Sequence, residues 1–273
     1  MDKYFVTKDN IKLRYEDNSV DNPKAIIVIV HGFAEHIGRY DYLTKKLNDN
    51  GYSVFRYDAR GHGLSLSKLG HMKDYSEMVD DLFEIVNFLK NNNQNIKIFT
   101  IGHSMGGNIA ANFGIKFPNI LEGQLFSGAA LENIQSATGI KKSLLKISSK
   151  LFNKLYIPNP VDDAISSDKN VVYEYMKDPL VLKRATIGFL NQFIIKATEN
   201  IWENVERYSY PCFIGHGVDD RVVLKEASEN FYKCISSEDK TLKLYDSLYH
   251  EIFNEQQKDY VIKDYIDWLD ERC

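Results

Sequence analysis

The stretch from residue 96 to residue 117 constrains the fold of this chain most strongly. Residues 96–100 alternate and are rich in β-branched side chains, which predicts a strand, and residues 108–117 have the composition of a helix. Between them stand Gly102, Ser104 and Gly106, in the pattern Gly-x-Ser-x-Gly. This pattern also arises by chance in glycine-rich loops, so the flanking strand and helix carry the interpretation. We expect a tight turn that holds Ser104 in a strained conformation at a helix N-terminus, with its hydroxyl exposed.

Strands and helices alternate along most of the chain. All six residues of 25–30 are apolar, which is typical of a strand buried on both faces of a parallel sheet. The alternation predicts an α/β fold with a mostly parallel central sheet and helices on both faces. The expected strands are 5–6 with 11–15 as a hairpin, 25–30, 52–57, 96–100, 123–127, 211–215 and 241–245, and the expected helices are 40–50, 75–91, 108–117, 225–234 and 256–269.

The alternation stops between residues 130 and 206, where the sequence is polar and helical. We interpret this segment as an inserted helical cap, or lid, over the carboxyl ends of the strands, where open α/β sheets bind ligands. The predicted domain organisation is therefore a core of residues 1–129 and 207–273 with a cap of residues 130–206.

Composition excludes several classes of protein. The 273 residues carry a formal net charge of -4, which does not favour nucleic acid as a partner. Three cysteines, Cys212, Cys234 and Cys273, are too few and odd in number for a disulfide framework, and they fit a reducing compartment. The N-terminus has no apolar signal segment, and the longest apolar run, 25–30, is far shorter than the roughly 20 residues that span a bilayer. We expect a cytoplasmic protein.

A serine hydroxyl becomes a useful nucleophile when a base removes its proton. On α/β folds with this turn, the acid follows the serine in the chain and the histidine follows the acid. Of the seven histidines only His216 and His250 come after the cap, and His216 closes a strand too early to be the base. His250 lies in the loop after the last strand. The acid should follow residue 215, where Asp219 and Asp220 are candidates; we favour Asp220, which would hold the imidazole of His250 in the required tautomer.

A developing oxyanion needs two backbone N–H donors. One should belong to Met105, the residue after the serine, and the other to the loop after residue 30, where we assign it to Phe33. Loss of one such donor typically costs about 3 kcal/mol of transition-state stabilisation.

Five ordered motifs resemble those of the α/β-hydrolase superfamily, in its monoacylglycerol lipase and lysophospholipase branch, which is grouped with the serine aminopeptidases. They are His31-Gly32-Phe33-Ala34-Glu35-His36 with Gly38-Arg39-Tyr40, Asp58-Ala59-Arg60-Gly61-His62-Gly63-Leu64-Ser65, Gly102-His103-Ser104-Met105-Gly106-Gly107, His216-Gly217-Val218-Asp219-Asp220 and His250-Glu251, and the cap adds Asp178-Pro179-Leu180. The resemblance covers nearly the whole chain and implies a triad of Ser104, Asp220 and His250 with no cofactor and no metal. It also implies that the motif around His62 is structural, with its aspartate and arginine pinning loops under the site.

The resemblance suggests substrate contacts too. Glu35 and Arg39 would lie near the position where monoacylglycerol lipases bind a glycerol head group; alternatively, they form an ion pair that fixes the oxyanion loop. Two residues depart from the family pattern. Ala34 stands where the lipases usually have glycine, and Phe253 stands where glycerol-specific enzymes tend to have a second histidine. Esterase activity is therefore better supported than specificity for monoacylglycerols.

The cap contains a basic amphipathic segment, residues 139–158. A set of apolar residues shares one helical face, and five lysines lie off that face: Ile140, Leu144, Ile147, Leu151, Phe152 and Leu155, with Lys141, Lys142, Lys146, Lys150 and Lys154. Such a helix can rest weakly on an anionic membrane. The interpretation we favour from the sequence is an ordinary cap helix, with its apolar face on an acyl pocket and its basic face in water.

The sequence thus predicts a serine carboxylester hydrolase acting on single-chain lipid esters or short acyl esters, with a small ester or lipid as its partner. One alternative is an aminopeptidase, which needs carboxylates in the cap to hold a free amine; Glu174, Asp178 and Glu203 are candidates. Another is a catalytically silent ligand-binding module. A metal hydrolase is disfavoured because no His-Glu-x-x-His occurs. Nothing in the sequence predicts an oligomeric state.

Overall fold

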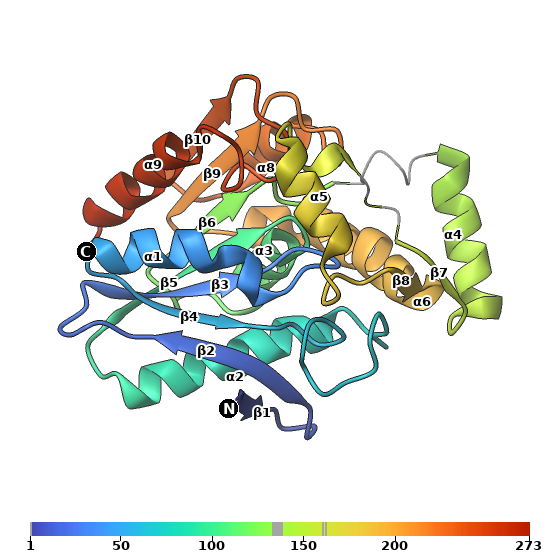
Figure 1. Cartoon of the computed structure of the whole chain (residues 1–273), viewed down its shortest axis with the longest axis horizontal. Coiled ribbons are helices and arrows are strands. Elements are labelled where there is room, and N and C mark those ends of the chain that lie inside the picture. Colours follow the sequence, from blue (N-terminus) through green and yellow to red (C-terminus); the bar gives the residue numbers. More distant parts are fainter. Residues whose placement is uncertain (1, 133–138, 160, 162) are drawn as a thin grey trace.

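The computed structural model describes residues 2–132, 139–159, 161 and 163–273. Within these residues, eight strands form one sheet in the order β1-β2-β4-β3-β5-β6-β9-β10 (Figure 1). The pairs β1–β2 and β2–β4 are antiparallel, and the other pairs are parallel. The strands are β1 (Lys3–Val6), β2 (Lys12–Asn18), β3 (Ala25–Val30), β4 (Ser53–Tyr57), β5 (Lys97–His103), β6 (Gly123–Ser127), β9 (Cys212–Gly217) and β10 (Lys240–Tyr245). The mostly parallel sheet predicted from the sequence is confirmed.

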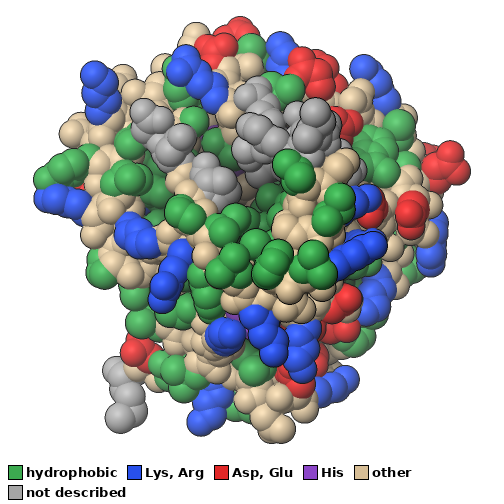
Figure 2. Space-filling view, turned by 90° about the vertical axis from the view of Figure 1, so that its right-hand side faces the viewer, with side chains coloured by type: hydrophobic (Ala, Val, Ile, Leu, Met, Phe, Trp, Pro, Cys, Tyr) green, Lys and Arg blue, Asp and Glu red, His purple; other side chains and the backbone are tan. Residues whose placement is uncertain are grey.

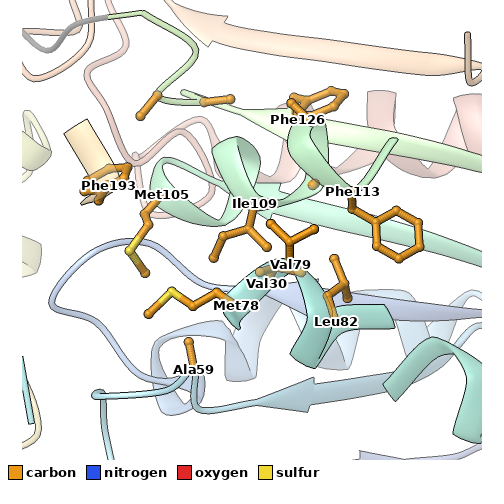
Figure 3. Close-up of a cluster of buried hydrophobic side chains, with 14 of the residues drawn as sticks. Val30, Ala59, Met78, Val79, Leu82, Met105, Ile109, Phe113, Phe126 and Phe193 are labelled. Atoms are coloured by element: carbon orange, nitrogen blue, oxygen red, sulfur yellow. The ribbon is translucent and has the colours of Figure 1, made fainter. Parts of the chain in front are cut away.

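Helices cover both faces of the sheet. On one face α1 and α9 share a hydrophobic core. On the other face α2, α3 and α8 share a second core, in which Met105 and Ile109 of α3 lie beside Met78 and Val79 of α2 (Figure 3). These helices are α1 (Asp41–Asp49), α2 (Ser76–Asn92), α3 (Met105–Lys116), α8 (Glu226–Cys234) and α9 (Lys258–Asp270).

The central strand β3 shows why this chain makes a two-sided sheet. All six of its residues are buried, and successive side chains point to opposite faces. Ile26, Val28 and Val30 enter the core with α2 and α3, whereas Ile27 and Ile29 enter the core with α1 and α9. The unbroken apolar run in the sequence is the result of burial on both faces.

The described part of the cap contains more than helices. After helix α4 (Gly139–Phe152), strands β7 (Tyr156–Pro158) and β8 (Arg184–Thr186) pair antiparallel. The other cap elements are the 3-10 helix η3 (Asp163–Ile165), α5 (Lys169–Lys177), α6 (Ile187–Leu190), the π-helix η4 (Asn191–Ala197), α7 (Thr198–Asn204) and the 3-10 helix η5 (Val205–Arg207), and outside the cap η1 (Ile37–Tyr40) precedes α1. The segment that we predicted to be a helical cap thus also contains one pair of short strands, whose three-residue patterns are too short to detect in the sequence.

The apolar side chains of helix α4 are more exposed than we expected from the sequence. The helix ends at Phe152, and most of its described apolar side chains are exposed, although Leu145 packs against the core. Leu144 and Ile147 are each 59% exposed, and Leu151 is 72% exposed. Phe152 and Leu155 are exposed as well. The side chains of Ile140, Lys141 and Lys142 lie outside the described residues. The interpretation of the apolar face as buried on an acyl pocket is therefore wrong for the side chains described.

None of the described helices is long and apolar enough to cross a membrane. The division into a core of residues 1–129 and 207–273 and a cap of residues 130–206 stays a prediction.

Candidate active site

The turn after β5 holds Ser104 in a strained backbone conformation, with φ 51° and ψ -115°. The glycines around it are required by close packing. A Cβ on Gly106 would lie 1.9 Å from the carbonyl oxygen of Val30, and one on Gly102 would lie 2.6 Å from the carbonyl oxygen of Gly106. Real Cβ atoms do not approach so closely, so the serine turn depends on glycine at both positions. Helix α3 begins at the next residue, Met105.

His250 shares a hollow with Ser104 and contacts Asp220. Nδ1 of His250 lies 2.7 Å from Oδ2 of Asp220. Oδ1 of Asp220 accepts the backbone N–H groups of Val222 at 2.8 Å and Val223 at 3.0 Å. Ser104 and His250 both line one small hollow. The structure thus brings together the three residues of the predicted triad, whereas Asp219 is exposed.

Burial and charge set the protonation of this pair. Burial lowers the pKa of His250, but the Asp220 carboxylate outweighs burial, and the net pKa is raised above the ordinary value of histidine. Burial also raises the pKa of Asp220, but His250 and His216 outweigh it, so this pKa lies well below its ordinary range. Asp220 is therefore ionised wherever His250 titrates. A carboxylate at Nδ1 fixes the tautomer in which Nε2 can accept a proton.

The two predicted oxyanion donors follow β3 and β5. Among the described residues, neither the N–H of Phe33 nor that of Met105 has a hydrogen-bond acceptor. Met105 opens α3, and the first amides of a helix have no partner within it. Phe33 is held by aromatic packing from the cap, with ring centres 5.5 Å from Phe189 and 6.1 Å from Phe193. That these two N–H groups bind a developing negative charge stays a prediction.

Ala34, which follows Phe33, stands where the lipases usually have glycine. Ala34 has φ 67°, in the left-handed region that favours glycine. Its carbonyl oxygen accepts the N–H of Leu182 from the cap at 2.9 Å. The oxyanion loop thus needs a left-handed residue at this position, and this chain adopts that conformation without glycine.

Glu35, Arg39 and Glu251 form a buried charged group beside the hollow. Nη2 of Arg39 lies 2.5 Å from Glu251 Oε2, and Nε of Arg39 lies 3.6 Å from Glu35 Oε1. Glu35 Oε2 also accepts the N–H of Gly32 at 3.0 Å and the hydroxyl of Tyr40 at 2.7 Å. The oxygens of Glu35 are therefore engaged by the protein itself.

The pKa values of these two carboxyl groups move in opposite directions. Burial raises the pKa of Glu251 above its usual range, because the single guanidinium of Arg39 only partly offsets it. Burial also raises the pKa of Glu35, but His103 and Arg39 outweigh this effect, and the net pKa is lowered. Glu35 therefore stays ionised, whereas burial and the neighbouring Glu35 charge make Glu251 easier to protonate.

Phe253 is buried in the core and does not line the hollow of Ser104. Its ring packs against Tyr265 of α9 with centres 4.8 Å apart, and it is buried in the core under α1 and α9. Phe253 lines a neighbouring cavity together with Arg39, and the hollow that holds Ser104 is lined instead by Glu35, His103, Tyr175 and Glu251, among others.

The motif around His62 supports the loops beneath the site. Asp58 accepts the N–H of Ile37 at 2.9 Å and that of Leu64 at 2.8 Å. Arg60 bonds Asp81 through two nitrogens, at 2.9 and 2.7 Å. His62 is fully buried, and burial lowers its pKa to about 3, so it is neutral. These contacts agree with the structural role that the resemblance implies.

Sequence reasoning missed several contacts. His216, set aside as a base, lies 3.0 Å from Asp220 Oδ2 through its Nε2. Tyr175 of the cap stacks under Arg39, with its ring centre 4.9 Å from the guanidinium carbon. The four-residue spacing of His216 and Asp220 was the only available signal for the first contact, and no local pattern indicates the second. Among the described residues, no group of three His, Cys, Asp or Glu side chains is arranged to hold a metal ion.

The fold and the arrangement around Ser104 define an α/β-hydrolase. A family described as Serine aminopeptidase, S33, matches residues 21–257, and the chain belongs to this family. It is similar to the monoacylglycerol lipase of Mycolicibacterium smegmatis, with 31% identity over 248 residues that cover 91% of this chain and 89% of that protein. The phospholipase YtpA of Bacillus subtilis is 27% identical over 250 residues, which cover 89% of this chain and 94% of that protein.

Solved structures agree with this assignment. The monoacylglycerol lipase of Paleococcus ferrophilus is 27% identical and superposes with a TM-score of 0.87, covering 96% of this chain and 99% of that one. The predicted relationship to the monoacylglycerol lipase branch of the α/β-hydrolases is confirmed.

Proposed function

We propose that this protein is a serine carboxylester hydrolase that cleaves single-chain lipid esters, of the monoacylglycerol or lysophospholipid type, or short acyl esters. Ser104 Oγ attacks the ester carbonyl while His250 takes its proton, and the alcohol leaves with that proton. The N–H groups of Phe33 and Met105 stabilise the oxyanion. Water, deprotonated by His250, then attacks the acyl-enzyme and releases the carboxylic acid, which restores Ser104.

The contact between His250 and Asp220 at the hollow of Ser104 carries this proposal, with Nδ1 and Oδ2 2.7 Å apart. A silent binding module has no need for an ionised acid that orients a buried histidine beside a strained serine. Lipid substrates are supported by the relatives, a monoacylglycerol lipase and a phospholipase by name.

Aminopeptidase activity is less well supported. It needs an unpaired carboxylate for the free amine of the substrate. Glu174 and Glu203 are exposed, and Asp178 is engaged by His36 Nε2 at 2.8 Å. Glu35 and Glu251 do line the hollow of Ser104, but both are engaged by Arg39. No carboxylate described at the hollow is therefore free for an ammonium group.

For Glu35 and Arg39 we favour the structural alternative over direct contact with a head group. Glu35 bonds Gly32 N–H and so fixes the oxyanion loop, and Arg39 links Glu35 to Glu251. Phe253 then acts as core packing beneath this group, which removes one polar contact to a glycerol head group. These assignments favour an esterase without strict dependence on glycerol.

Weak peripheral contact of the cap with membranes is part of the proposal. Figure 2 shows hydrophobic side chains gathered in a band on the cap side of the molecule, with lysine and arginine side chains around it. Leu144, Ile147 and Leu151 of α4 are exposed, and Lys150 and Lys154 are exposed near them. A basic amphipathic helix with an uncovered apolar face suits an anionic lipid surface. Liposome co-sedimentation at low and high salt tests it, and absence of salt-sensitive binding would refute it.

A cytoplasmic location is also proposed. Within the described residues Cys212, Cys234 and Cys273 are all free thiols, which fits a reducing compartment. Cell fractionation with the native sequence would test this.

The central test is a substrate panel. A p-nitrophenyl ester series of increasing chain length is run beside a monoacylglycerol, a lysophospholipid and an aminoacyl anilide, with Ser104→Ala as the inactive variant and the exposed Ser143→Ala as its matched control. We expect hydrolysis of esters that disappears in Ser104→Ala alone. Cleavage of the anilide without the esters would favour the aminopeptidase instead.

A further inference from the structure

The Asp220 carboxylate has four polar contacts, with two backbone N–H groups and two histidine rings. Oδ1 accepts the N–H groups of Val222 and Val223, and Oδ2 lies 2.7 Å from His250 Nδ1. Oδ2 also lies 3.0 Å from Nε2 of a second histidine, His216 at the end of β9. The side chains of His216 and Asp220 are both fully buried.

The surroundings of His216 fix the position of its proton. Nε2 hydrogen-bonds the carbonyl oxygen of Val223 at 3.0 Å and faces Asp220 Oδ2 at the same distance. Both oxygens are acceptors only, so Nε2 must carry a hydrogen. Nδ1 lies 2.7 Å from the hydroxyl of Ser228 in α8, which can donate to a neutral ring or accept from a charged one.

Val223 connects His216 to the carboxylate a second time. Its N–H donates to Asp220 Oδ1, and its carbonyl accepts from His216. The imidazole of His216 therefore contacts both the Asp220 carboxylate and the 220–223 loop, whose N–H groups bind that carboxylate. Ser228 anchors the ring from the other side, on a helix that does not otherwise contribute to the site.

We propose that His216 is a positioning residue for catalysis: its Nε2–H, directed by Ser228, holds the Asp220 carboxylate and the 220–223 loop in the orientation that His250 requires. The proposal rests on the roles proposed above for Ser104, Asp220 and His250. It extends the contacts of the Asp220–His250 pair to four residues, from His250 through Asp220 and His216 to Ser228. Such outer partners fix orientation by restricting the rotation of the group they hold.

Other titratable groups also face His250. The ring of His103 has its centre 4.7 Å away, and the carboxyl groups of Glu35 and Glu251, linked by Arg39, lie beside the same hollow. A substitution of His216 removes none of these groups, so we attribute a change in pH dependence in such a variant to Asp220.

The first test compares two substitutions of similar size. His216→Gln retains an N–H donor at the position of Nε2, whereas His216→Met has none. We expect His216→Gln to keep kcat within about threefold of the parent. His216→Met should lose about tenfold in kcat with little change in KM, because a misplaced carboxylate misplaces the base. In His216→Met the acid limb of the kcat/KM profile should move to higher pH by about half a unit. Without the Nε2–H donor, the negative charge on Oδ2 is less compensated and stabilises the protonated form of His250 more strongly.

A purely structural role predicts a different result. Both variants would then lose thermal stability to a similar extent, with equal kcat and an unmoved acid limb, and this result would overturn the proposal.

The second test needs no variant and no substrate, so its failure is separate from failure of the proposed function. Nitrogen-15 histidine NMR of the parent protein, assigned with His216→Gln, reports the protonation of each ring nitrogen. We expect Nε2 of His216 to carry its proton from pH 6 to 9. Detection of the tautomer protonated only on Nδ1 would contradict the proposal.

Discussion

Nη2 of Arg39 lies 2.5 Å from Oε2 of Glu251, the residue that follows His250. The same guanidinium reaches Glu35, which holds the oxyanion loop through Gly32 N–H. Arg39 therefore connects the loop after β3 with the loop after β10, and both loops carry residues of the candidate site. All three charged side chains are less than a tenth exposed, so the group depends on its own pairing rather than on water.

Arg39→Met should destabilise the protein by about 3–5 kcal/mol, because it leaves two carboxyl groups buried without their cation. Chemical denaturation measures the free energy of unfolding. The control is Lys45→Ala, which removes an exposed pair with Asp49 and should cost less than about 1 kcal/mol. A loss below about 1 kcal/mol in Arg39→Met would mean that the buried group does not support the fold.

The pH dependence of ester hydrolysis should reflect the raised pKa of His250. The base acts only when unprotonated, so kcat/KM should fall on the acid side with an apparent pKa above about 6.5, the ordinary value for histidine. In Asp220→Asn the residual activity should show an acid limb at lower pH, because burial then acts without the opposing carboxylate. An acid limb that stays unchanged in Asp220→Asn would contradict the Asp220–His250 pairing.

Ala34→Gly should stabilise the protein. A non-glycine residue in the left-handed region costs about 1–2 kcal/mol, and the greater freedom of glycine in the unfolded chain returns about 0.4–1 kcal/mol of this. We therefore expect a net gain of about 0.5–1 kcal/mol in the free energy of unfolding. Ala111→Gly, inside α3, is the matched control and should have the opposite sign, with a loss of about 1 kcal/mol or more. Destabilisation by both would show that Ala34 is not strained.

Leu151→Glu, at a position 72% exposed on α4, should reduce binding to anionic liposomes without changing hydrolysis of a water-soluble ester. Tyr260→Glu, at a similarly exposed aromatic residue on α9, is the control and should leave liposome binding close to that of the parent. Co-sedimentation measures both. Equal binding by Leu151→Glu and the parent would remove α4 from the membrane contact.

The core of the fold was predictable because its signals are local. The run of residues 25–30 and the turn around Ser104 each specify their own structure, through burial on two faces and through close packing of glycine. Element boundaries moved by a few residues; β5, for example, extends to His103 and α3 begins at Met105. Hydrogen bonding at the turn sets where β5 ends and α3 begins, and the amino-acid composition of the segment does not predict it.

The candidate site was predictable where chain order limits the choice, as for His250 and Asp220. Contacts between distant segments were not. Arg39 pairs with Glu251 across 212 positions, and His216 bonds a carbonyl whose place depends on the folded loop. The exposure of Leu151 was missed for a related reason: an apolar helical stripe indicates a face but not whether another element covers it.

The most direct test of the central claim is covalent labelling of the nucleophile, followed by peptide mass spectrometry. The protein is treated with a fluorophosphonate, which reacts with activated serines, and its ester hydrolysis is followed in parallel. We predict one adduct, on the peptide that carries Ser104, loss of hydrolysis in proportion to labelling, and neither labelling nor hydrolysis in Ser104→Ala. An adduct on another residue, or unchanged hydrolysis in Ser104→Ala, would contradict the account.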